Sequence, residues 1–572
     1  MKNQEVARLF RDIADILQIK GANPFRIRAY QKAAQNIESL SEDIAQISEE
    51  GRLTSIPGIG KDLSEGIEEF LATGTTRAFE ELKKSIPLGL LELLSIPSLG
   101  PKTAKLFYEQ LGIKDLKGLQ DALRKGKLTQ LYGIKEKTVA NIAKGIELIK
   151  MGKERMTLAK ALEAARPFLA ALEQLAGVEK FAYAGSLRRC RETVRDIDIL
   201  VVSRDPAGVI GSFVKLEPVA DILAKGTTKS AVRTREGIQV DCRVVEKKSF
   251  GAALLYFTGS KNFNIRLRQM AIKKGLKINE YGVFKGEKLV AGKSEEEIFR
   301  LLGMQYVEPE LREDSGEIEA ALGGSLPRLI APSDIKGDLH AHSQWSDGQN
   351  SIEEMAEAAM RKGYSYLAIT DHSQGLVVAN GLNEQALKKK KRQIDKLNAR
   401  IKKFRILFAT EVDIRSDGSL DYPDRVLAQF DLVVAAIHSG FKQPRHQLTH
   451  RLLSACRSPY VHIIAHPTGR LFCVRDAYDA DMEALFKEAA ETNTALEVNA
   501  YPNRMDLNDA HCRRAGEMGV RLAIGTDAHD IEHLDGMSLG VSICRRGWLE
   551  KKNVLNALDT DTLLRTIKRK KV

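Results

Sequence analysis

The sequence predicts a multi-domain protein in which α-helical domains precede an α+β region and a C-terminal distorted β/α barrel. Three observations lead to this fold class. The chain has 572 residues, and a single hydrophobic core rarely grows to that size. Apolar positions at helical spacing fill residues 1–150, whereas short, β-branched apolar runs begin at about Phe181. Beyond residue 334, short buried strands alternate with helices, as they do in parallel barrels and in layered α/β domains.

Composition narrows the class of protein. A hydrophobic fraction of 43% and a charged fraction of 29% exclude a largely disordered chain. No apolar run approaches the roughly 20 residues needed to cross a membrane, and Asp12 and Asp15 interrupt the N-terminal segment, so we expect a cytoplasmic protein. Six cysteines without a CxxC pair argue against a disulfide framework or a zinc ribbon. The net charge of +12 suits a nucleic acid partner, although charge alone is equally compatible with a merely positive surface.

Three similar glycine-containing turns connect the expected N-terminal helices, at 53–61, 94–102 and 128–135. Such a turn leaves backbone N–H groups uncovered at the start of a helix, where a DNA phosphate is favoured. One turn is weak evidence because glycine often ends helices for local reasons, but three favour DNA binding. They resemble helix-hairpin-helix motifs, although Tyr132 makes the third atypical. The residues expected to contact the DNA backbone are Gly58, Gly60, Lys61, Gly100 and Lys102.

Aspartates in two expected strands indicate a centre for divalent metal ions. Asp196 and Asp198 are two residues apart, which places both carboxylates on one strand face with Cα atoms about 6.5 Å apart. Asp241 lies in a second strand and would join them if the two strands are neighbours. Three carboxylates suit Mg²⁺, and two such ions would activate a primer 3′-hydroxyl and stabilise the leaving pyrophosphate.

A phosphate-binding loop is expected just upstream of these aspartates. Gly185 permits close approach of a triphosphate, Ser186 can donate a hydrogen bond, and Arg189 can neutralise charge. A solvent-facing strand with ordinary acids is the alternative interpretation of the two aspartates alone. The combination with the upstream loop and a third strand aspartate is far more specific.

The first 320 residues resemble the family X DNA polymerases, the group of DNA polymerase beta. The motifs that carry this resemblance are 23–34, 185–198, 256–264 and 275–281, together with Asp241. The resemblance implies that Asp196, Asp198 and Asp241 are catalytic and hold Mg²⁺ or Mn²⁺. It also implies that Tyr256, Phe257 and Gly259 line the sugar pocket and disfavour ribose. By the same resemblance, Asn264 would contact the incoming base or minor groove, and Arg268 the template strand. Without the resemblance, residues 256–260 indicate only a strand end with a turn.

Four positions depart from the family pattern. Cys190 and Arg195 replace glycines beside the phosphate-contacting Arg189 and the catalytic Asp196, and both replacements would restrict the backbone and weaken nucleotide binding. Gly66 stands where lyase-active members carry their Schiff-base lysine, so we expect no deoxyribose-phosphate lyase activity. Asp62 at a usually basic position weakens the pocket for the 5′-phosphate of a gap.

Histidines and acids gather at the expected strand ends of the C-terminal barrel, which form the active-site face in this architecture. A single histidine at a strand end is more often structural than a ligand, but that interpretation must explain nine residues independently. Mixed imidazole and carboxylate ligands suit several Mn²⁺, Zn²⁺ or Fe²⁺ ions, which would promote phosphoester hydrolysis. The expected ligands are His340, His342, Asp347, His372, Glu411, His438, His466, Asp527 and His529.

Residues 334–572 resemble the PHP (polymerase and histidinol phosphatase) domain, whose trinuclear metal ligands match these nine positions. Glu497 and Asn499 are expected to orient ligands. Residues 388–405 are expected to form a basic surface helix. The histidines interpreted as structural are His446, His450, His462, His511 and His533.

The resemblance covers the whole chain and predicts its organisation. The expected segments are an N-terminal helical DNA-binding domain (1–85), a second helical domain (86–150), a nucleotidyltransferase palm (151–249), a nucleotide-binding terminal polymerase domain or thumb (250–320), a linker (321–333) and the PHP domain (334–572).

The expected function is DNA repair by two active sites. One would fill gaps in primer-template DNA with dNTPs, and the other would remove 3′-terminal nucleotides or trim blocked 3′ ends. We expect a monomer. Two alternatives remain open at this point: a nuclease whose degenerate polymerase half is a DNA-binding scaffold, and a small-molecule phosphatase fused to a DNA-binding module.

Overall fold

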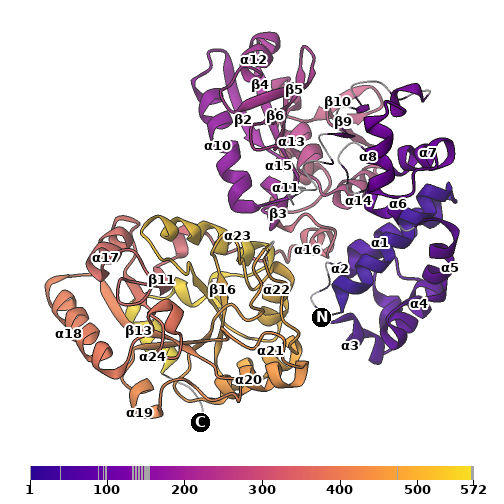
Figure 1. Cartoon of the computed structure of the whole chain (residues 1–572). Coiled ribbons are helices and arrows are strands. Elements are labelled where there is room, and N and C mark those ends of the chain that lie inside the picture. Colours follow the sequence, from indigo (N-terminus) through magenta and orange to yellow (C-terminus); the bar gives the residue numbers. More distant parts are fainter. Residues whose placement is uncertain are drawn as a thin grey trace.

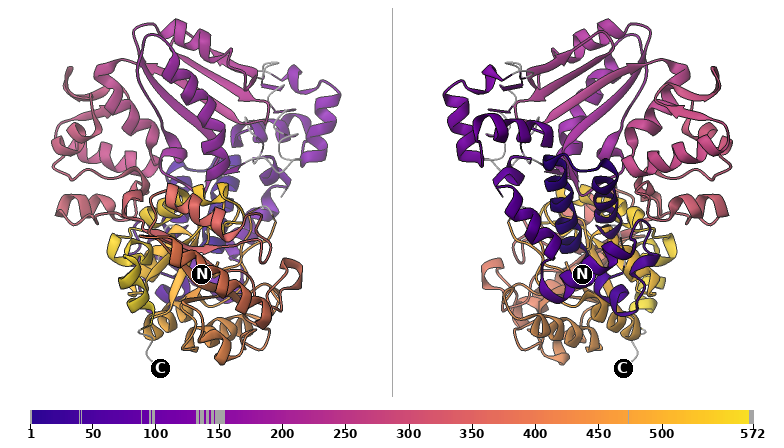
Figure 2. Two further views of the ribbon diagram at one scale, coloured as in Figure 1. Left: turned by 90° about the vertical axis from the view of Figure 1, so that its left-hand side faces the viewer. Right: turned by 90° about the vertical axis from the view of Figure 1, so that its right-hand side faces the viewer.

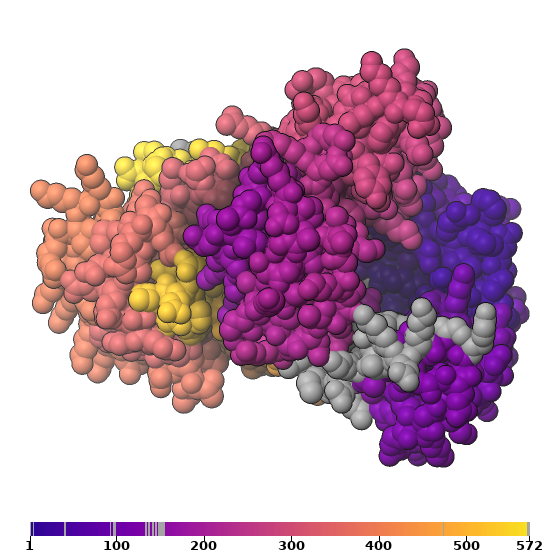
Figure 3. All heavy atoms as spheres, turned by 90° about the horizontal axis from the view of Figure 1, so that it is seen from above, coloured from indigo at the N-terminus to yellow at the C-terminus, as the bar shows by residue number. Residues whose placement is uncertain are grey.

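The computed structural model of the chain describes residues 2–38, 40, 42–87, 89–94, 96, 99–131, 134, 138–139, 142–143, 146, 155–472 and 474–568. The barrel lies below the palm, and the N-terminal helices lie beside both (Figure 1). Two side views place the palm at one end of the molecule and the barrel at the other (Figure 2). Seen from above, the palm lies between the barrel and the N-terminal helices (Figure 3).

The N-terminal part is helical, as the sequence predicts. Its apolar side chains form one cluster that runs from Val6 to Ile146, so both expected helical segments pack on a common core. Side-chain caps begin several helices, for example Thr76, whose hydroxyl accepts a hydrogen bond from Phe79. The helices are α1 (Asn3–Lys20), α2 (Pro24–Glu38), α3 (Ile44–Glu49), α4 (Lys61–Thr73), α5 (Arg77–Ser85), α6 (Gly89–Leu93), α7 (Pro101–Leu111) and α8 (Leu116–Arg124).

The palm is a five-stranded mixed sheet in the order β2-β4-β7-β6-β5, and β4 and β7 are its parallel pair. Residues of β4 alternate between two apolar clusters: Ile197 and Ile199 pack with α10 and α12, whereas Leu200 packs against α13. The elements are β1 (Met156–Thr157), α10 (Leu158–Gln174), β2 (Val178–Tyr183), α11 (Gly185–Arg188), β3 (Thr193–Val194), β4 (Asp196–Ser203), α12 (Pro206–Phe213), β5 (Val219–Lys225), β6 (Lys229–Thr234) and β7 (Gln239–Val245).

The thumb follows the palm in the sequence, and its first helix differs from what the sequence indicates. Residues 256–260, which by themselves suggest a strand end with a turn, instead end helix α13. Nearly every α13 residue is buried, so the segment lacks the polar face by which a helix is recognised in a sequence. The elements are α13 (Phe250–Thr258), α14 (Lys261–Lys273), β8 (Lys277–Asn279), β9 (Gly282–Lys285), β10 (Lys288–Ala291), α15 (Glu295–Leu301) and α16 (Glu317–Gly323).

A buried ion-pair network joins the palm to the thumb. Glu295 of α15 accepts hydrogen bonds from Arg188 at 2.6 Å and from Arg312, whose side chain is fully buried. Burial alone would raise the pKa of Glu295, but these two guanidinium groups outweigh it and lower the pKa to about 2. Because the charged form is favoured in the folded state, the network contributes stability above pH 4.5 that is lost as the pH falls towards 2.

Glu295→Gln is therefore expected to destabilise the polymerase half by about 3 kcal/mol or more at neutral pH, because it leaves two buried guanidinium charges without their partner. The loss should shrink as the pH falls from 4.5 towards 2. Denaturant unfolding at pH 7 and at pH 3 would measure both effects. Glu296→Gln, at an exposed position of the same helix, is the matched control. Equal stability of the two variants at pH 7 would contradict the prediction.

The C-terminal domain is a parallel barrel of seven strands in consecutive order, nearly closed by a bridge between Ala341 and Ala528. Both faces of its strands are apolar, as buried parallel strands require: Ile406 and Phe408 enter one cluster, and Leu407 and Ala409 another. The strands are β11 (Gly337–Ala341), β12 (Tyr366–Ile369), β13 (Arg405–Asp413), β14 (Leu432–Ala436), β15 (Ile463–Ile464), β16 (Ala495–Asn499) and β17 (Leu522–Gly525).

The barrel helices hold a second correction. The basic helix expected at 388–405 ends at Arg400, and Arg405 begins β13. Lys390 on this helix is fully buried rather than solvated. The helices are α17 (Ile352–Arg361), α18 (Glu384–Arg400), α19 (Asp424–Leu427), α20 (Arg445–Arg457), α21 (Met482–Thr492), α22 (Asp509–Glu517), α23 (Met537–Arg546) and α24 (Thr560–Ile567). No described helix is both long and apolar enough to cross a membrane.

Polar contacts hold the barrel against the polymerase half. Arg546 is 2% exposed and donates to Asp509 in its own domain, to Glu313 of the polymerase half at 3.1 Å and to the backbone oxygen of Arg189 at 2.7 Å. Arg470 forms a bidentate pair with Glu192 at 2.6 and 3.1 Å. These contacts fix the barrel beside the loop that follows α11.

Candidate metal centres in the palm and the barrel

The palm brings its three aspartates together. In the parallel β4–β7 pair, Asp198 lies directly opposite Asp241, and Asp196 lies two residues earlier on the same face. Burial, and then the neighbouring carboxylates, raise the pKa of Asp198 to about 7. Three carboxylates that repel one another are a donor set whose chemistry suits Mg²⁺ or Mn²⁺, although their oxygen atoms do not all lie within 4.8 Å of one another in the described structure.

Gly185 places the upstream loop against this cluster. Its φ of +62° lies in the left-handed region, and a Cβ at this position would press against the Oδ2 atom of Asp198. The chain is anchored there because Ala184 N–H donates to the Asp198 carbonyl at 2.8 Å. Gly185 therefore allows both the left-handed backbone conformation and the close approach of the Asp198 carboxylate.

Gly185→Ala is expected to lower the rate of nucleotide addition about 100-fold, because it displaces Asp198 from its position in the cluster. Single-nucleotide incorporation would measure the effect, and hydrolysis by the barrel should be unchanged. Gly211→Ala in α12, where a Cβ meets nothing within 4 Å, is the matched control. Normal incorporation by Gly185→Ala would contradict the argument.

Arg189 is held between the loop and the thumb. It donates to Glu313 at 3.0 Å and to the carbonyl of Thr258. Gly259 has a φ of +73°, and a Cβ there would lie 3.1 Å from the Arg189 guanidinium. An incoming triphosphate would therefore have to compete with Glu313 for the Arg189 guanidinium.

The residues expected to bind the nucleotide lie at the end of α13 and in α14. Tyr256 and Phe257 make an edge-to-face contact with ring centroids 5.1 Å apart. Asn264 donates to the Tyr256 carbonyl at 2.7 Å, and Arg268 donates to the Asn264 carbonyl at 3.3 Å. Sequence analysis missed Arg243, whose guanidinium lies 4.6 Å from the Phe257 ring centroid. Its position two residues after Asp241 on one strand face was the available signal.

The two expected backbone restrictions beside the loop differ in outcome. Cys190 has a φ of +53°, a conformation that favours glycine, and so this replacement is strained. Arg195 is not among the described residues with positive φ, so the expected restriction there is wrong. Its side chain is instead exposed in a cleft between the palm and the barrel.

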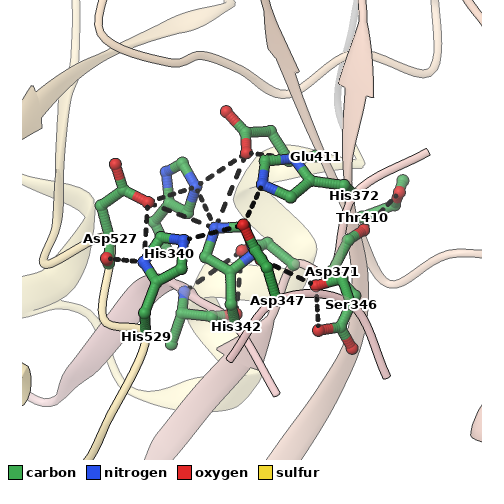
Figure 4. A network of polar contacts seen from close by, with 12 residues as sticks. His340, His342, Ser346, Asp347, Asp371, His372, Thr410, Glu411, Asp527 and His529 are labelled. Carbon is green, nitrogen blue, oxygen red and sulfur yellow. Dashed lines mark hydrogen bonds and ion pairs between the residues drawn. The ribbon is translucent and has the colours of Figure 1, made fainter. Parts of the chain in front are cut away.

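The barrel gathers the nine expected ligands at and beside its strand ends. Figure 4 labels His340, His342, Asp347, His372, Glu411, Asp527 and His529 among them. Three groups have ligand atoms within 4.8 Å of one another, and Glu411 links the ninth residue, His466, at 2.9 Å. Burial, followed by the charge of His372, lowers the pKa of His342 to about 4, and burial likewise lowers that of His466 to about 4. The groups are His342, Asp347, His372 and His529; His340, His342 and Asp527; and His372, Glu411 and His438.

This donor set fits several transition-metal ions. The Nδ1 atoms of His342 and His466 are buried without a hydrogen-bond partner in the described structure. Glu497 accepts from His340 Nδ1 at 2.6 Å and from the His466 backbone at 2.7 Å, and Asn499 donates to Asp527 at 3.2 Å. Both groups expected to orient ligands therefore contact them.

A buried pair behind the centre escaped sequence analysis. Asp371 accepts from the backbone N–H and hydroxyl of Ser343 and from the hydroxyl of Ser346, which holds the loop that carries Asp347. Lys390 of α18 neutralises Asp371 at 2.9 Å and is itself fully buried. Asp371 directly precedes His372, but its partner is 19 residues further along the chain, on a helix that looked solvated.

The helical turns are present where the structure describes them. Gly58 has a φ of +83°, and Gly60 and Gly100 directly precede α4 and α7 in extended conformation. Lys61 and Lys102 are exposed at the start of these helices. The third expected turn, around Tyr132, lies outside the described residues. A pocket of about 260 Å³ beside Gly66 is lined by Asp62, Glu65 and Glu69 but by no lysine among the residues described.

Comparisons with known proteins identify the family. Family descriptions match four segments: a helix-hairpin-helix domain (1–76), a SAM-like helix-hairpin-helix tandem (90–147), the DNA polymerase beta thumb (253–313) and a PHP domain (338–501). The DNA polymerase/3′-5′ exonuclease PolX of Bacillus subtilis (strain 168) is 43% identical over 97% of this chain and 98% of its own length. The chain belongs to the family X DNA polymerases that carry a C-terminal PHP domain.

Two other relatives each match one part of this family X polymerase. DNA polymerase lambda of Rattus norvegicus is 28% identical over 54% of the chain and 56% of its own length. A probable phosphatase of Thermoanaerobacter sp. (strain X514) is 27% identical over 41% of the chain and 95% of its own length. The expected family, its helix-hairpin-helix domains and its PHP barrel are therefore confirmed.

Proposed function

We propose that this family X polymerase repairs DNA with two separate active sites, adding nucleotides at gaps in the palm and removing 3′-terminal nucleotides in the PHP barrel. The observation that carries the proposal is the β4–β7 register, which makes one cluster of three strand aspartates, in a chain whose barrel holds a second, histidine-rich cluster. The relative with 43% identity is named for both activities.

Nucleotide addition depends on positions that the palm residues fix. Asp196, Asp198 and Asp241 would hold Mg²⁺ or Mn²⁺ between the primer terminus and the triphosphate. Ser186 would donate a hydrogen bond to the triphosphate. Arg189 would leave Glu313 and pair with the negative charge of the triphosphate. Tyr256, Phe257 and Gly259 would hold the sugar, with Asn264 at the base and Arg268 at the template strand.

Hydrolysis depends on the barrel residues. The nine ligands would hold up to three Mn²⁺, Zn²⁺ or Fe²⁺ ions, and Glu497 and Asn499 keep His340 and Asp527 oriented. At either centre, bound divalent cations supply Lewis-acid stabilisation of phosphate charge and lower the pKa of the attacking hydroxyl or water. Arg504 forms an ion pair with Asp527 at 3.2 Å and presents a buried Nη1 atom without a hydrogen-bond partner in the described structure, which suits a scissile phosphate.

The N-terminal helical turns suit gapped or primer-template DNA as the substrate, with dNTPs as co-substrates. Gly58, Gly60, Lys61, Gly100 and Lys102 would hold the DNA backbone without reading its sequence. The acidic pocket beside Gly66 supports the absence of lyase activity. We place the protein in the cytoplasm and expect it to act as a monomer.

The decisive experiment uses a duplex with a one-nucleotide gap and a labelled primer. Primer length is followed with Mg²⁺ or Mn²⁺, with and without the complementary dNTP. Growth by one nucleotide with dNTP and shortening without it would support two working sites. Shortening in both conditions would make the polymerase half a scaffold, consistent with the strain at Cys190. Turnover of small phosphomonoesters alone would favour a phosphatase.

A further inference from the structure

A large cleft separates the palm from the PHP barrel, with a volume of about 950 Å³. This volume is at the upper end of the range for pockets that enclose drug-sized ligands, so the cleft has room for more than a single nucleotide. One wall is the palm segment 186–196, and the facing wall is the barrel segment 468–477.

The cleft borders the palm centre directly, and on the barrel side it borders segments that follow two of the expected ligands in the sequence. Ser186 and Asp196 line its palm end. Its barrel wall begins two residues after the expected ligand His466. Arg475 in that wall lies over the ring of Phe441 at 3.7 Å, three residues after the expected ligand His438. The same surface therefore borders the segments that carry both centres.

The cleft is lined by nine arginines and lysines and by seven acids, so its positive charge is only partly neutralised. Arg470 is paired with Glu192 across the cleft. Arg155, Arg195 and Arg475 form no ion pair with an acid anywhere in the described ranges of the chain. Burial, then Arg191 and Arg195, lower the pKa of Arg155; burial, then Arg504, lower that of Arg475. Guanidinium groups that repel one another leave a site that an anion stabilises.

Aromatic rings accompany these cations. Phe472 lies under the guanidinium of Arg470 at 4.8 Å and is partly exposed to the cleft. Trp548, with Arg513 over its ring at 4.1 Å, lines the cleft as well. A positive groove with aromatic side chains is the combination that holds single-stranded nucleic acid, since phosphates meet the cations and bases stack on the rings.

We propose that this interdomain cleft binds the unpaired 3′-terminal segment of a primer between the palm and the PHP centre. The proposal extends the proposed function by giving the two sites a shared path for the 3′ end. The pairs Arg470–Glu192 and Arg546–Glu313 keep the two walls in place, so the path is part of the folded molecule. An acidic peptide would use the cations but not the proximity to both centres.

Binding is tested on the full chain in EDTA, which prevents hydrolysis. Fluorescence anisotropy compares a labelled gapped duplex with a paired primer end to one whose primer ends in four unpaired thymidines. The wild type should prefer the frayed duplex, and Phe472→Leu combined with Arg475→Gln should reduce that preference about tenfold. Lys388→Ala combined with Lys389→Ala, two exposed cations on α18, is the matched control.

A second variant tests the opposite wall, so that the result does not depend on correct folding of the barrel segment alone. Arg195→Gln on the facing wall should weaken binding of the frayed duplex in the same direction. Thermal unfolding would show whether the variants remain folded. An unchanged preference for the frayed end in both wall variants, or an equal loss in the α18 control, would overturn the proposal.

Hydrolysis separates this proposal from the proposed function. Phe472→Leu combined with Arg475→Gln should slow removal of the unpaired thymidines while leaving extension of the paired primer and hydrolysis of bis(p-nitrophenyl) phosphate unchanged. A wild type that hydrolyses neither DNA nor this small diester would refute the proposed hydrolytic function, and the anisotropy result would still decide the cleft. Equal loss of all three activities would assign these residues to structure and reject the path.

Discussion

Replacing Asp198 by asparagine is expected to lower nucleotide addition about 1,000-fold or more and to leave 3′ hydrolysis unchanged. Asp198 lies at the centre of the palm cluster, opposite Asp241 in the neighbouring strand and behind Gly185. An amide keeps the shape of the side chain but removes the charge that would hold a divalent cation. The expected loss corresponds to roughly 4 kcal/mol of transition-state stabilisation.

Single-turnover incorporation at a one-nucleotide gap would measure the loss, because it isolates chemistry from product release. Glu236→Gln, which also neutralises a carboxylate in the palm but away from the cluster, is the control. A folded Asp198→Asn variant that incorporates nucleotides within tenfold of the wild type would show that the β4–β7 cluster is not the polymerase centre.

Replacing Asp527 by asparagine is expected to have the opposite effect, a loss of 3′ hydrolysis of about 1,000-fold or more with normal nucleotide addition. Asp527 lies 3.2 Å from His342 and 3.6 Å from His340, and it also forms an ion pair with Arg504. Its carboxylate is the acid shared by these two imidazoles, so the variant should also retain less metal. Metal content by mass spectrometry therefore gives a reading independent of activity.

Asp535→Asn, an exposed aspartate paired with Lys362, controls for loss of charge near the barrel rim. Asp527→Asn with full metal content and full hydrolysis would remove Asp527 from the centre. If either aspartate variant eliminated both activities while remaining folded, the separation of the two sites would be wrong.

The fold could be predicted where the hydrophobic periodicity of a segment matches its burial in the folded protein. Alternation in β4 placed Asp196 and Asp198 on one face, but only the three-dimensional pairing of β4 with β7 places Asp241 beside them. Helix α13 was missed because burial on every side removes its polar face. The backbone at Arg195 also differed from expectation, because the resemblance supplied a glycine and not the φ that this chain adopts.

The barrel site was predictable because its ligands follow strand ends, a local feature of the sequence. Its supporting residues were not. Lys390 neutralises Asp371 from a helix that reads as a solvated lysine run, and Arg470 reaches Glu192 across 278 positions of the chain. Ion pairs between residues so far apart produce no recognisable pattern in a single sequence. The residues that support a site are therefore harder to predict than the metal ligands themselves.

The contact of Arg546 with Glu313 and with the Arg189 carbonyl has a consequence for how this protein can change over evolutionary time. Loss of Arg546 would leave Asp509 without this ion pair and would remove one of the guanidinium groups around Glu313, which would destabilise the contact between the two halves. A relative that substitutes one of the three should therefore substitute another. The polymerase half and the PHP half would be inherited as a matched pair, and a chimera that joins halves from distant relatives would lose stability unless this triad is transferred with them.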